Sequence, residues 1–261
     1  MKLTKKETLT LISLIIILIA INYSWLDSLV VKSFSDDEFV KIDRVIDGDT
    51  VEVNGASIRL LGINTPEKKE KYYQEAKDSL NEKILNKTVR LEYGKDKTDR
   101  YNRTLAYIFL NNENINLKQV EQGFANYYFP AGKDVYYNDF KEAWENCIKE
   151  NKNLCEKSIN VCTKCIELKE LNYDPQEAVF FNQCNFDCNL KDWRIKDEGR
   201  KNFICPDFNL NSKKEVVVKV GENSNDEDIL FWQGEDYVWT KTGDTLFLRD
   251  SEGKLVIWKS Y

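Results

Sequence analysis

The sequence predicts a multidomain protein with one transmembrane helix, then a small β-barrel with helices packed on it, then an all-β sandwich. Three observations predict this architecture. Residues 9–21 form a mainly apolar run without charged residues. Residues 38–150 alternate between strand and helix patterns, an order typical of a barrel covered by helices. Residues 166–261 contain short apolar pieces between turn residues, which is typical of a sandwich.

The apolar run indicates export. Counted to Leu26, the segment is long enough for a marginal membrane span, and no Ala-x-Ala cleavage site follows it. We therefore favour an uncleaved anchor over a cleaved signal peptide. The flanking charges also fit this orientation, because lysines precede the run and acidic residues follow it: Lys2, Lys5, Lys6, Asp27, Asp36, Asp37 and Glu38. The rest of the chain is expected outside the cytoplasm, on the cell membrane as a single-pass protein, or secreted if the segment is cleaved.

Composition excludes several kinds of catalysis. The 261 residues suffice for two domains, and 42% hydrophobic with 31% charged residues is typical of globular protein. The chain contains no histidine, which excludes imidazole bases, histidine zinc sites and Ser-His triads. Residues 38–130 carry 15 basic and 15 acidic side chains, whereas residues 166–261 carry 13 and 19. The C-terminal part is thus poorly suited to bind duplex phosphates.

All seven cysteines lie between Cys147 and Cys205. In an exported protein this pattern favours disulfides with one thiol left over. The spacings Cys162-x-x-Cys165 and Cys184-x-x-x-Cys188 leave a zinc site as an alternative, and free thiols are a third.

The predicted organisation has four parts: an anchor and linker at residues 1–37, a first domain at 38–150, a cysteine-bearing connector at 151–165, and a sandwich at 166–261. In the first domain, strands are expected at residues 39–46, 50–53, 57–61, 88–93 and 104–110, and helices at 69–86, 116–122 and 135–152. Asn54-Gly55 predicts a tight hairpin, and Gly123 a helix cap. In the sandwich, strands are expected at residues 178–181, 193–195, 216–220, 229–232, 237–239, 245–248 and 255–258.

Four charged residues of the first domain suit phosphodiester hydrolysis. Two guanidinium groups, from Arg59 and Arg103, can hold the oxygens of a phosphate as charge develops on them. Asp49 can bind a hard cation, and Glu67 can take a proton from water. Taken singly, each of these residues could instead have a purely structural role, in a turn, on the surface of a strand or at the start of a helix. Their combination in this order favours a hydrolytic site.

Three segments carry a resemblance to a known family: residues 46–51 (IDGDTV), 58–67 (IRLLGINTPE) and 98–107 (TDRYNRTLAY). The region that contains them, about residues 38–150, resembles the thermonuclease, or staphylococcal nuclease, family. The resemblance implies a five-stranded OB-fold barrel and calcium-dependent endonucleolytic hydrolysis of DNA and RNA. Single strands would be preferred, and 3′-phosphates would be left.

The resemblance also assigns residues to roles by motif position. Arg59, Glu67 and Arg103 would be catalytic, with Glu67 as general base. Calcium would be held by the side chains of Asp49 and Asn64 and by the backbone carbonyl of Thr65. Asp47 would lie behind these ligands, and Arg100 and Tyr101 would contact the terminal phosphate of the nucleotide.

Two positions depart from the family pattern. Asn64 stands where aspartate is usual, so a carbonyl oxygen remains but one negative charge is lost, and we expect weaker calcium affinity. Asn102 stands where glycine is usual, and asparagine tolerates a left-handed turn.

The C-terminal part shows a looser resemblance. Residues 180–182 (FFN), 188–198 (CNLKDWRIKDE) and 239–250 (WTKTGDTLFLRD) look like a lamin-tail domain. This implies an immunoglobulin-like sandwich that binds or scaffolds an unknown ligand. The alternatives to a nuclease are a non-catalytic OB module that binds single strands, and a structural surface protein whose active part is the sandwich.

Overall fold

The computed structural model describes residues 38–261. The membrane segment and linker predicted for residues 1–37 lie outside the described residues. Within residues 38–261, no helix is both long and apolar enough to cross a membrane. Residues Phe39–Tyr261 form one compact unit. The predicted domain boundaries at residues 38, 151 and 166 stay predictions.

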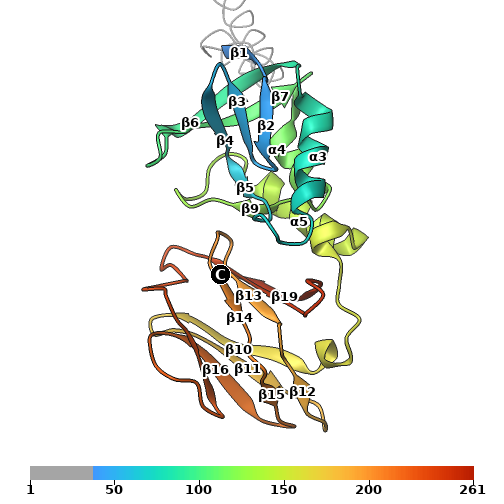
Figure 1. Ribbon diagram of the computed structural model, residues 1–261, viewed down its shortest axis with the longest axis vertical. Coiled ribbons are helices and arrows are strands. Elements are labelled where there is room, and N and C mark those ends of the chain that lie inside the picture. Colours follow the sequence, from blue (N-terminus) through green and yellow to red (C-terminus); the bar gives the residue numbers. More distant parts are fainter. Residues whose placement is uncertain (1–37) are drawn as a thin grey trace, which may run out of the picture. The chain divides into compact units, whose positions relative to one another are not determined.

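A curled sheet forms the barrel region (Figure 1). Its strands follow the order β1-β6-β7-β4-β3-β2, with β8 beside β7, and a separate pair β5-β9 adjoins them in the chain. Their bounds are β1 Glu38–Lys41, β2 Arg44–Asp47, β3 Thr50–Val53, β4 Ala56–Leu60, β5 Gly62–Asn64, β6 Thr88–Thr98, β7 Thr104–Leu110, β8 Glu113–Asn114 and β9 Asn126–Tyr128. The expected OB-like fold is confirmed, but the sheet has seven strands instead of five, because the segment 39–46 forms two strands, β1 and β2, and the short strand β8 pairs with the end of β7.

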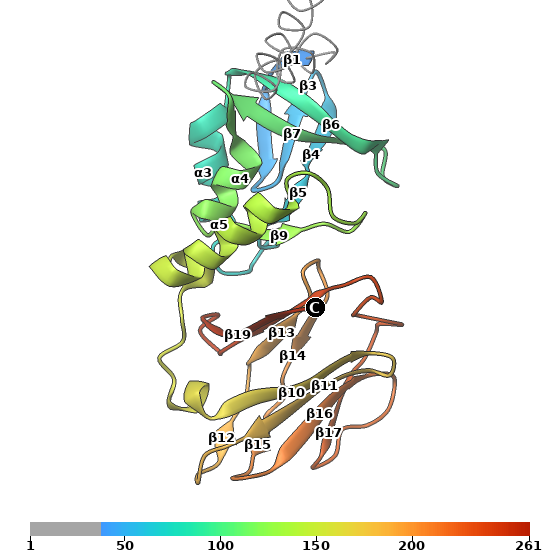
Figure 2. The same cartoon turned by 180° about the vertical axis from the view of Figure 1, so that it is seen from behind.

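Three helices lie together on one side of this sheet (Figures 1 and 2): α3 (Tyr73–Ile84), α4 (Ile115–Glu121) and α5 (Tyr137–Glu150). Helix α3 buries Ala76, Leu80 and Ile84, which stand one turn apart within the predicted helix at residues 69–86. It begins later than expected because Lys69 and Tyr72 adopt φ of 79° and 68°, which interrupt a right-handed helix.

The strand expected at residues 39–46 is broken at Ile42. Ile42 exchanges backbone hydrogen bonds with residues 86 and 87, whereas the amide of Asp43 donates to the carbonyl of Glu52. The backbone therefore changes its hydrogen-bonding partner here, from residues 86 and 87 to Glu52, and the segment divides into β1 and β2. The hairpin at Asn54-Gly55 is confirmed, with φ of 50° and 79°.

The C-terminal sheets contain two four-stranded layers that share one core (Figure 2). One layer has the order β10-β11-β16-β17, with bounds β10 Ile166–Tyr173, β11 Gln176–Asn182, β16 Glu215–Val220 and β17 Ile229–Trp232. The other has the order β14-β13-β18-β19, with bounds β13 Arg194–Lys196, β14 Asn202–Ile204, β18 Thr245–Arg249 and β19 Leu255–Ser260. A short pair, β12 (Cys188–Asn189) and β15 (Asn209–Leu210), adjoins them.

One predicted strand is wrong. Residues 237–239 form no strand, because backbone amides of this segment donate hydrogen bonds to the side chain of Gln176 instead. Its Oε1 accepts hydrogen bonds from the amides of Val238 at 2.8 Å and Trp239 at 2.9 Å. These amides are therefore satisfied without a neighbouring strand.

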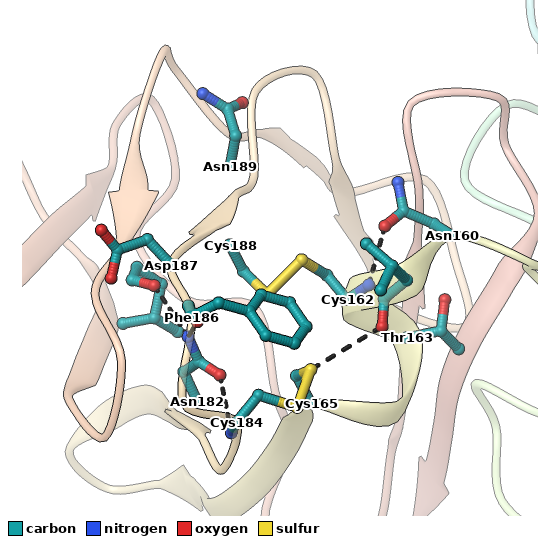
Figure 3. Close-up of a disulfide and its surroundings, with 12 residues drawn as sticks. Asn160, Cys162, Thr163, Cys165, Asn182, Cys184, Phe186, Asp187, Cys188 and Asn189 are labelled. Atoms are coloured by element: carbon teal, nitrogen blue, oxygen red, sulfur yellow. Dashed lines mark hydrogen bonds between the residues drawn. A yellow bond between two sulfur atoms is a disulfide. The ribbon is translucent and has the colours of Figure 1, made fainter.

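The cysteines form three disulfides: Cys147–Cys155, Cys162–Cys188 and Cys165–Cys184. Figure 3 shows the last two side by side, with the ring of Phe186 close to them. The four cysteines considered for zinc are therefore paired with one another as disulfides. Cys205 is the thiol left over, and it is buried.

The C-terminal sheets contact the barrel region through β18 and β19. Leu246 and Leu248 point into the sandwich core, so Phe247 between them points the other way and joins the barrel core. Its ring meets that of Trp144 on α5 edge to face, with centroids 5.5 Å apart. Nearby, Nη1 of Arg249 donates to the carbonyl of Leu154 at 2.6 Å.

This contact predicts a large effect of Phe247→Ala. The ring is 2% exposed, so its removal leaves a cavity, and the free energy of unfolding should fall by about 3–5 kcal/mol. Urea denaturation measures this loss. Phe186→Ala is the matched control, because that ring is 43% exposed and should cost under about 1 kcal/mol. Equal losses of unfolding free energy in the two variants would contradict the contact between Phe247 and the barrel core.

Candidate functional site

A buried ion pair marks the candidate site. Asp49 directly precedes β3, and Arg59 lies on β4 opposite Thr50. Nη2 of Arg59 lies 3.0 Å from Oδ2 of Asp49, with side chains only 8% and 9% exposed. The second nitrogen, Nη1, donates to the carbonyl of Leu60 at 2.6 Å. The guanidinium is therefore held in place by groups on its own sheet.

Two further predicted residues meet this pair. Oδ1 of Asn64, at the end of β5, accepts a hydrogen bond from Nη2 of Arg59 at 3.4 Å. The backbone amide of Thr65 donates to Oδ2 of Asp49 at 3.0 Å. The structure thus brings together Arg59, Asp49, Asn64 and Thr65, here named the Arg59 site.

Gly48 allows the turn before Asp49 to lie close to its neighbours. A Cβ atom at this position would meet Cβ of Ala76 at 2.8 Å and Cγ2 of Thr65 at 2.9 Å. The carbonyl of Gly48 also accepts a hydrogen bond from Nε2 of Gln119 at 3.2 Å. Helices α3 and α4 therefore fix the turn that presents Asp49.

The donor atoms at the Arg59 site fit a hard cation. Burial, and then the charge of Asp49, raise the pKa of Asp47 to about 6. The oxygens of Asp49, Asn64 and Thr65 are carboxylate, amide and carbonyl donors, the types that calcium binds. Among the described residues, no group of three or more acidic, cysteine or histidine side chains forms a metal cluster.

Glu67 follows Thr65 of this site by two residues, a position here called the rim, and its side chain is half exposed. Its backbone amide donates to Oε2 of Glu70 at 2.7 Å. Its carboxylate pairs with Nε of Arg200, 3.1 Å from Oε1. The sequence reasoning missed Arg200, since it lies in another part of the chain and no local pattern connects it with Glu67.

The other predicted residues form a second cluster at the start of β7. Nε of Arg103 donates to Oδ2 of Asp99 at 2.7 Å, and Nη2 lies equally close. Asn102 has φ of 62°, as its tolerance of a left-handed turn predicts. The guanidinium groups of Arg100 and Arg103 lie over the ring of Tyr101, at 4.8 and 5.6 Å from its centroid.

Strand register relates this cluster to the Arg59 site. β4 and β7 are parallel, and Arg59 pairs with Leu105. Arg103 directly precedes β7, so it lies at the end of β7 that adjoins Arg59 on β4. In this structure, however, the Arg103 side chain is turned to Asp99.

A groove of about 440 Å³ lies elsewhere, between α4 and α5. Its lining includes Glu121, Asp139, Glu142 and Glu150. This acidic surface would repel a phosphate backbone. We therefore place no nucleic-acid site there.

Three carboxyl groups that the sequence reasoning missed lie in the C-terminal sheets; two are buried and one, Glu198, is partly buried. Asp197 and Glu198 belong to the turn between β13 and β14, residues 197–201, here named the hairpin tip, and Asp244 precedes β18. Burial, and then the charge of Asp244, raise the pKa of Asp197 to about 7 and that of Glu198 to about 8. The cluster thus takes up protons near neutral pH.

Comparison with known proteins links the sequence to nucleases. Residues 57–157 match the family described as staphylococcal nuclease homologue. The chain is 35% identical to a thermonuclease of Staphylococcus hyicus over 132 residues, which are 47% of this chain and 78% of that protein. It is 30% identical to a thermonuclease of Staphylococcus intermedius over 167 residues, 59% of this chain and 99% of that protein. An uncharacterized endonuclease of Haemophilus influenzae is 34% identical over 107 residues, which are 39% of this chain and 59% of that protein.

The close approach at Gly48 predicts the effect of Gly48→Ala. The added methyl group would displace Thr65 or α3, so the free energy of unfolding should fall by about 1–3 kcal/mol. Gly94→Ala is the control, because its Cβ would meet only the flexible end of Leu61. Chemical denaturation measures both variants, and an equal effect would contradict the role of Gly48.

The raised pKa values predict that the protein is less stable at alkaline pH. Asp197 and Glu198 have folded-state pKa values above their ordinary values of 3.8 and 4.5. Their contribution to stability is therefore complete below about pH 4 and is lost as the pH rises through 7 to 8. The free energy of unfolding should fall by a few kcal/mol, as an order of magnitude, between pH 5 and pH 9.

Denaturation in urea at a series of pH values measures this slope. The double variant Asp197→Asn, Glu198→Gln should flatten it. Glu227→Gln, at an exposed position, should leave it unchanged. A slope that stays the same in the double variant would exclude these groups as its cause.

Proposed function

This chain belongs to the family of staphylococcal nuclease homologues, and we propose that it is a calcium-dependent nuclease of DNA and RNA that prefers single strands and acts outside the cytoplasm. The family and the relatives named as endonucleases support a hydrolase of phosphodiester bonds. The observation that carries the proposal is the Arg59 site, where a buried guanidinium and oxygen donors meet within hydrogen-bonding distance.

In the proposed reaction, two guanidinium groups hold the scissile phosphate. Arg59 donates to a phosphate oxygen in exchange for Asp49, and Arg103 does so in exchange for Asp99. Both exchange a carboxylate for a phosphate, whose oxygens also accept charge-assisted hydrogen bonds from a guanidinium. Their charge then stabilises the additional negative charge that develops in the transition state.

Glu67 is proposed as the general base. Its half-exposed carboxylate takes a proton from a water molecule, whose oxygen attacks phosphorus as the bond to the 5′-oxygen breaks. The leaving oxygen takes up a proton from solvent, and a 3′-phosphate remains. Arg100 and Tyr101 would contact the terminal phosphate of the substrate.

Asp49, the Oδ1 atom of Asn64 and the carbonyl of Thr65 are proposed to hold calcium, with Asp47 behind them. Bound calcium would neutralise phosphate charge and orient the attacking water. With one carboxylate replaced by an amide, we expect an affinity in the range of extracellular modules, about 10⁻⁴–10⁻³ M.

For the C-terminal sheets we propose a lamin-tail-like, immunoglobulin-like sandwich that binds or scaffolds an unidentified ligand. Two facing sheets with one core support this proposal. For residues 1–37 we propose a membrane anchor, or a signal if it is cleaved. The three disulfides fit an oxidising compartment outside the cytoplasm.

Loss of Arg59 tests the proposed reaction. Arg59→Ala should lower hydrolysis of denatured DNA by roughly 10²–10³, because one donor to the transition state is lost. Arg44→Ala is the matched control, since Arg44 pairs with Glu52 on the exposed face of a neighbouring strand.

Assays of residues 38–261 in calcium, in magnesium and in chelator complete the test. Cleavage that requires calcium and disappears only in Arg59→Ala would support the nuclease. A folded protein that binds single strands in millimolar calcium without cutting them would instead support the non-catalytic OB module.

A further inference from the structure

The hairpin tip of the C-terminal sheets contacts the Arg59 site and its rim. The carbonyl of Gly199 accepts a hydrogen bond from Nδ2 of Asn64 at 2.7 Å. Beside it, Nδ2 of Asn126 donates to the carbonyl of Glu198 at 2.9 Å. At the rim, Arg200 pairs with Glu67. Two residues proposed to act in catalysis are therefore touched by one turn from a distant part of the chain.

Several contacts fix the backbone of this turn. At its base, Nζ of Lys196 lies 2.8 Å from Oε2 of Glu70, and both side chains are largely buried. Within the turn, Oδ1 of Asp197 accepts the amide of Lys201 at 2.9 Å. A Cβ atom on Gly199 would meet Oδ2 of Asp197 at 3.2 Å. The Gly199 carbonyl therefore has a defined position.

This carbonyl decides how the amide of Asn64 is oriented. A carbonyl oxygen only accepts hydrogen bonds, so the nitrogen of the Asn64 amide must face Gly199. The oxygen, Oδ1, then faces Arg59 and the side of Asp49. Asn64 is 2% exposed, so water has little access to compete for either atom. The atom that a hard cation binds is thereby turned toward the other donors of the site.

We propose that Gly199 is a positioning residue of the nuclease site, whose carbonyl orients Asn64 so that Oδ1 can bind calcium. This inference rests on the proposed function, in which Asn64 is a calcium ligand. An aspartate at position 64 would need no such orientation, because its two oxygens are equivalent. It would also set an oxygen against the carbonyl of Gly199 and lose the hydrogen bond.

A shortened turn removes the Gly199 carbonyl. Lys196 and Asn202 are directly paired across β13 and β14, so an Asn-Gly turn can replace residues 197–201. The replaced residues carry two acidic and two basic side chains, so the net charge of the chain does not change. Electrostatic attraction of calcium to the whole protein is therefore matched between the two forms.

Calcium affinity is measured by calorimetry on four forms of the full chain: wild type, shortened turn, Asn64→Asp, and both changes together. The shortened turn should raise the dissociation constant at least three-fold when residue 64 is asparagine. When residue 64 is aspartate, the shortened turn should not raise the dissociation constant, because it removes an oxygen that faces the carboxylate. Arg200→Ala, which keeps the carbonyl, should leave the affinity of the wild type unchanged. A loss of equal size with asparagine and with aspartate, or no loss at all, would overturn the proposal.

A second readout needs no calcium. In the NMR spectrum, the side-chain NH₂ signals of Asn64 should exchange slowly with solvent in the wild type and quickly in the shortened turn. Equal exchange in both forms would overturn the inferred contact. A wild type that binds no calcium, but shows the protected NH₂, would overturn the proposed calcium site and retain the contact. If the shortened turn does not fold, Gly199→Val replaces it, since its Cβ would already lie 3.2 Å from Oδ2 of Asp197 and 3.4 Å from the Tyr128 hydroxyl, and its two methyl groups would crowd the tip further.

Discussion

The buried pair of Arg59 and Asp49 is the interaction on which the rest of the site depends. Two charges removed from water are stable only if hydrogen bonds satisfy them. Here the carbonyl of Leu60, the amide of Asn64 and the backbone amide of Thr65 do so. The same contacts place the side-chain oxygens of Asp49 and Asn64, two donors of the proposed calcium site, beside one guanidinium. The stability of the folded barrel and the geometry of the site therefore have a common origin.

The C-terminal sheets belong to this arrangement as well. Phe247 joins the barrel core, and the hairpin tip reaches Asn64 and Glu67. The amide at position 64, which the sequence indicates only as a lost charge, has a structural partner in the carbonyl of Gly199. In the proposed account, the second region has a direct part in the geometry of the first.

Local patterns predicted much of the fold, because short-range chemistry determines it. Asn54-Gly55 specifies its hairpin, the spacing of Ala76, Leu80 and Ile84 specifies a helix face, and Asn102 accepts a left-handed turn. Long-range contacts account for the failures. Gln176 binds residues 238 and 239 and prevents a strand there, and Arg200 approaches Glu67 without any local signal. Motif order indicated the Arg59 site, whereas the contribution of the hairpin tip is visible only in the three-dimensional structure.

Diffraction from crystals of the full chain grown in calcium, with data collected at a wavelength where calcium scatters anomalously, tests the central claim most directly. The account predicts one anomalous peak in contact with Asp49 and with Oδ1 of Asn64, while Nδ2 still donates to the carbonyl of Gly199. A peak at Asp197 and Asp244 instead, or an Asn64 amide turned the other way beside the ion, would contradict it.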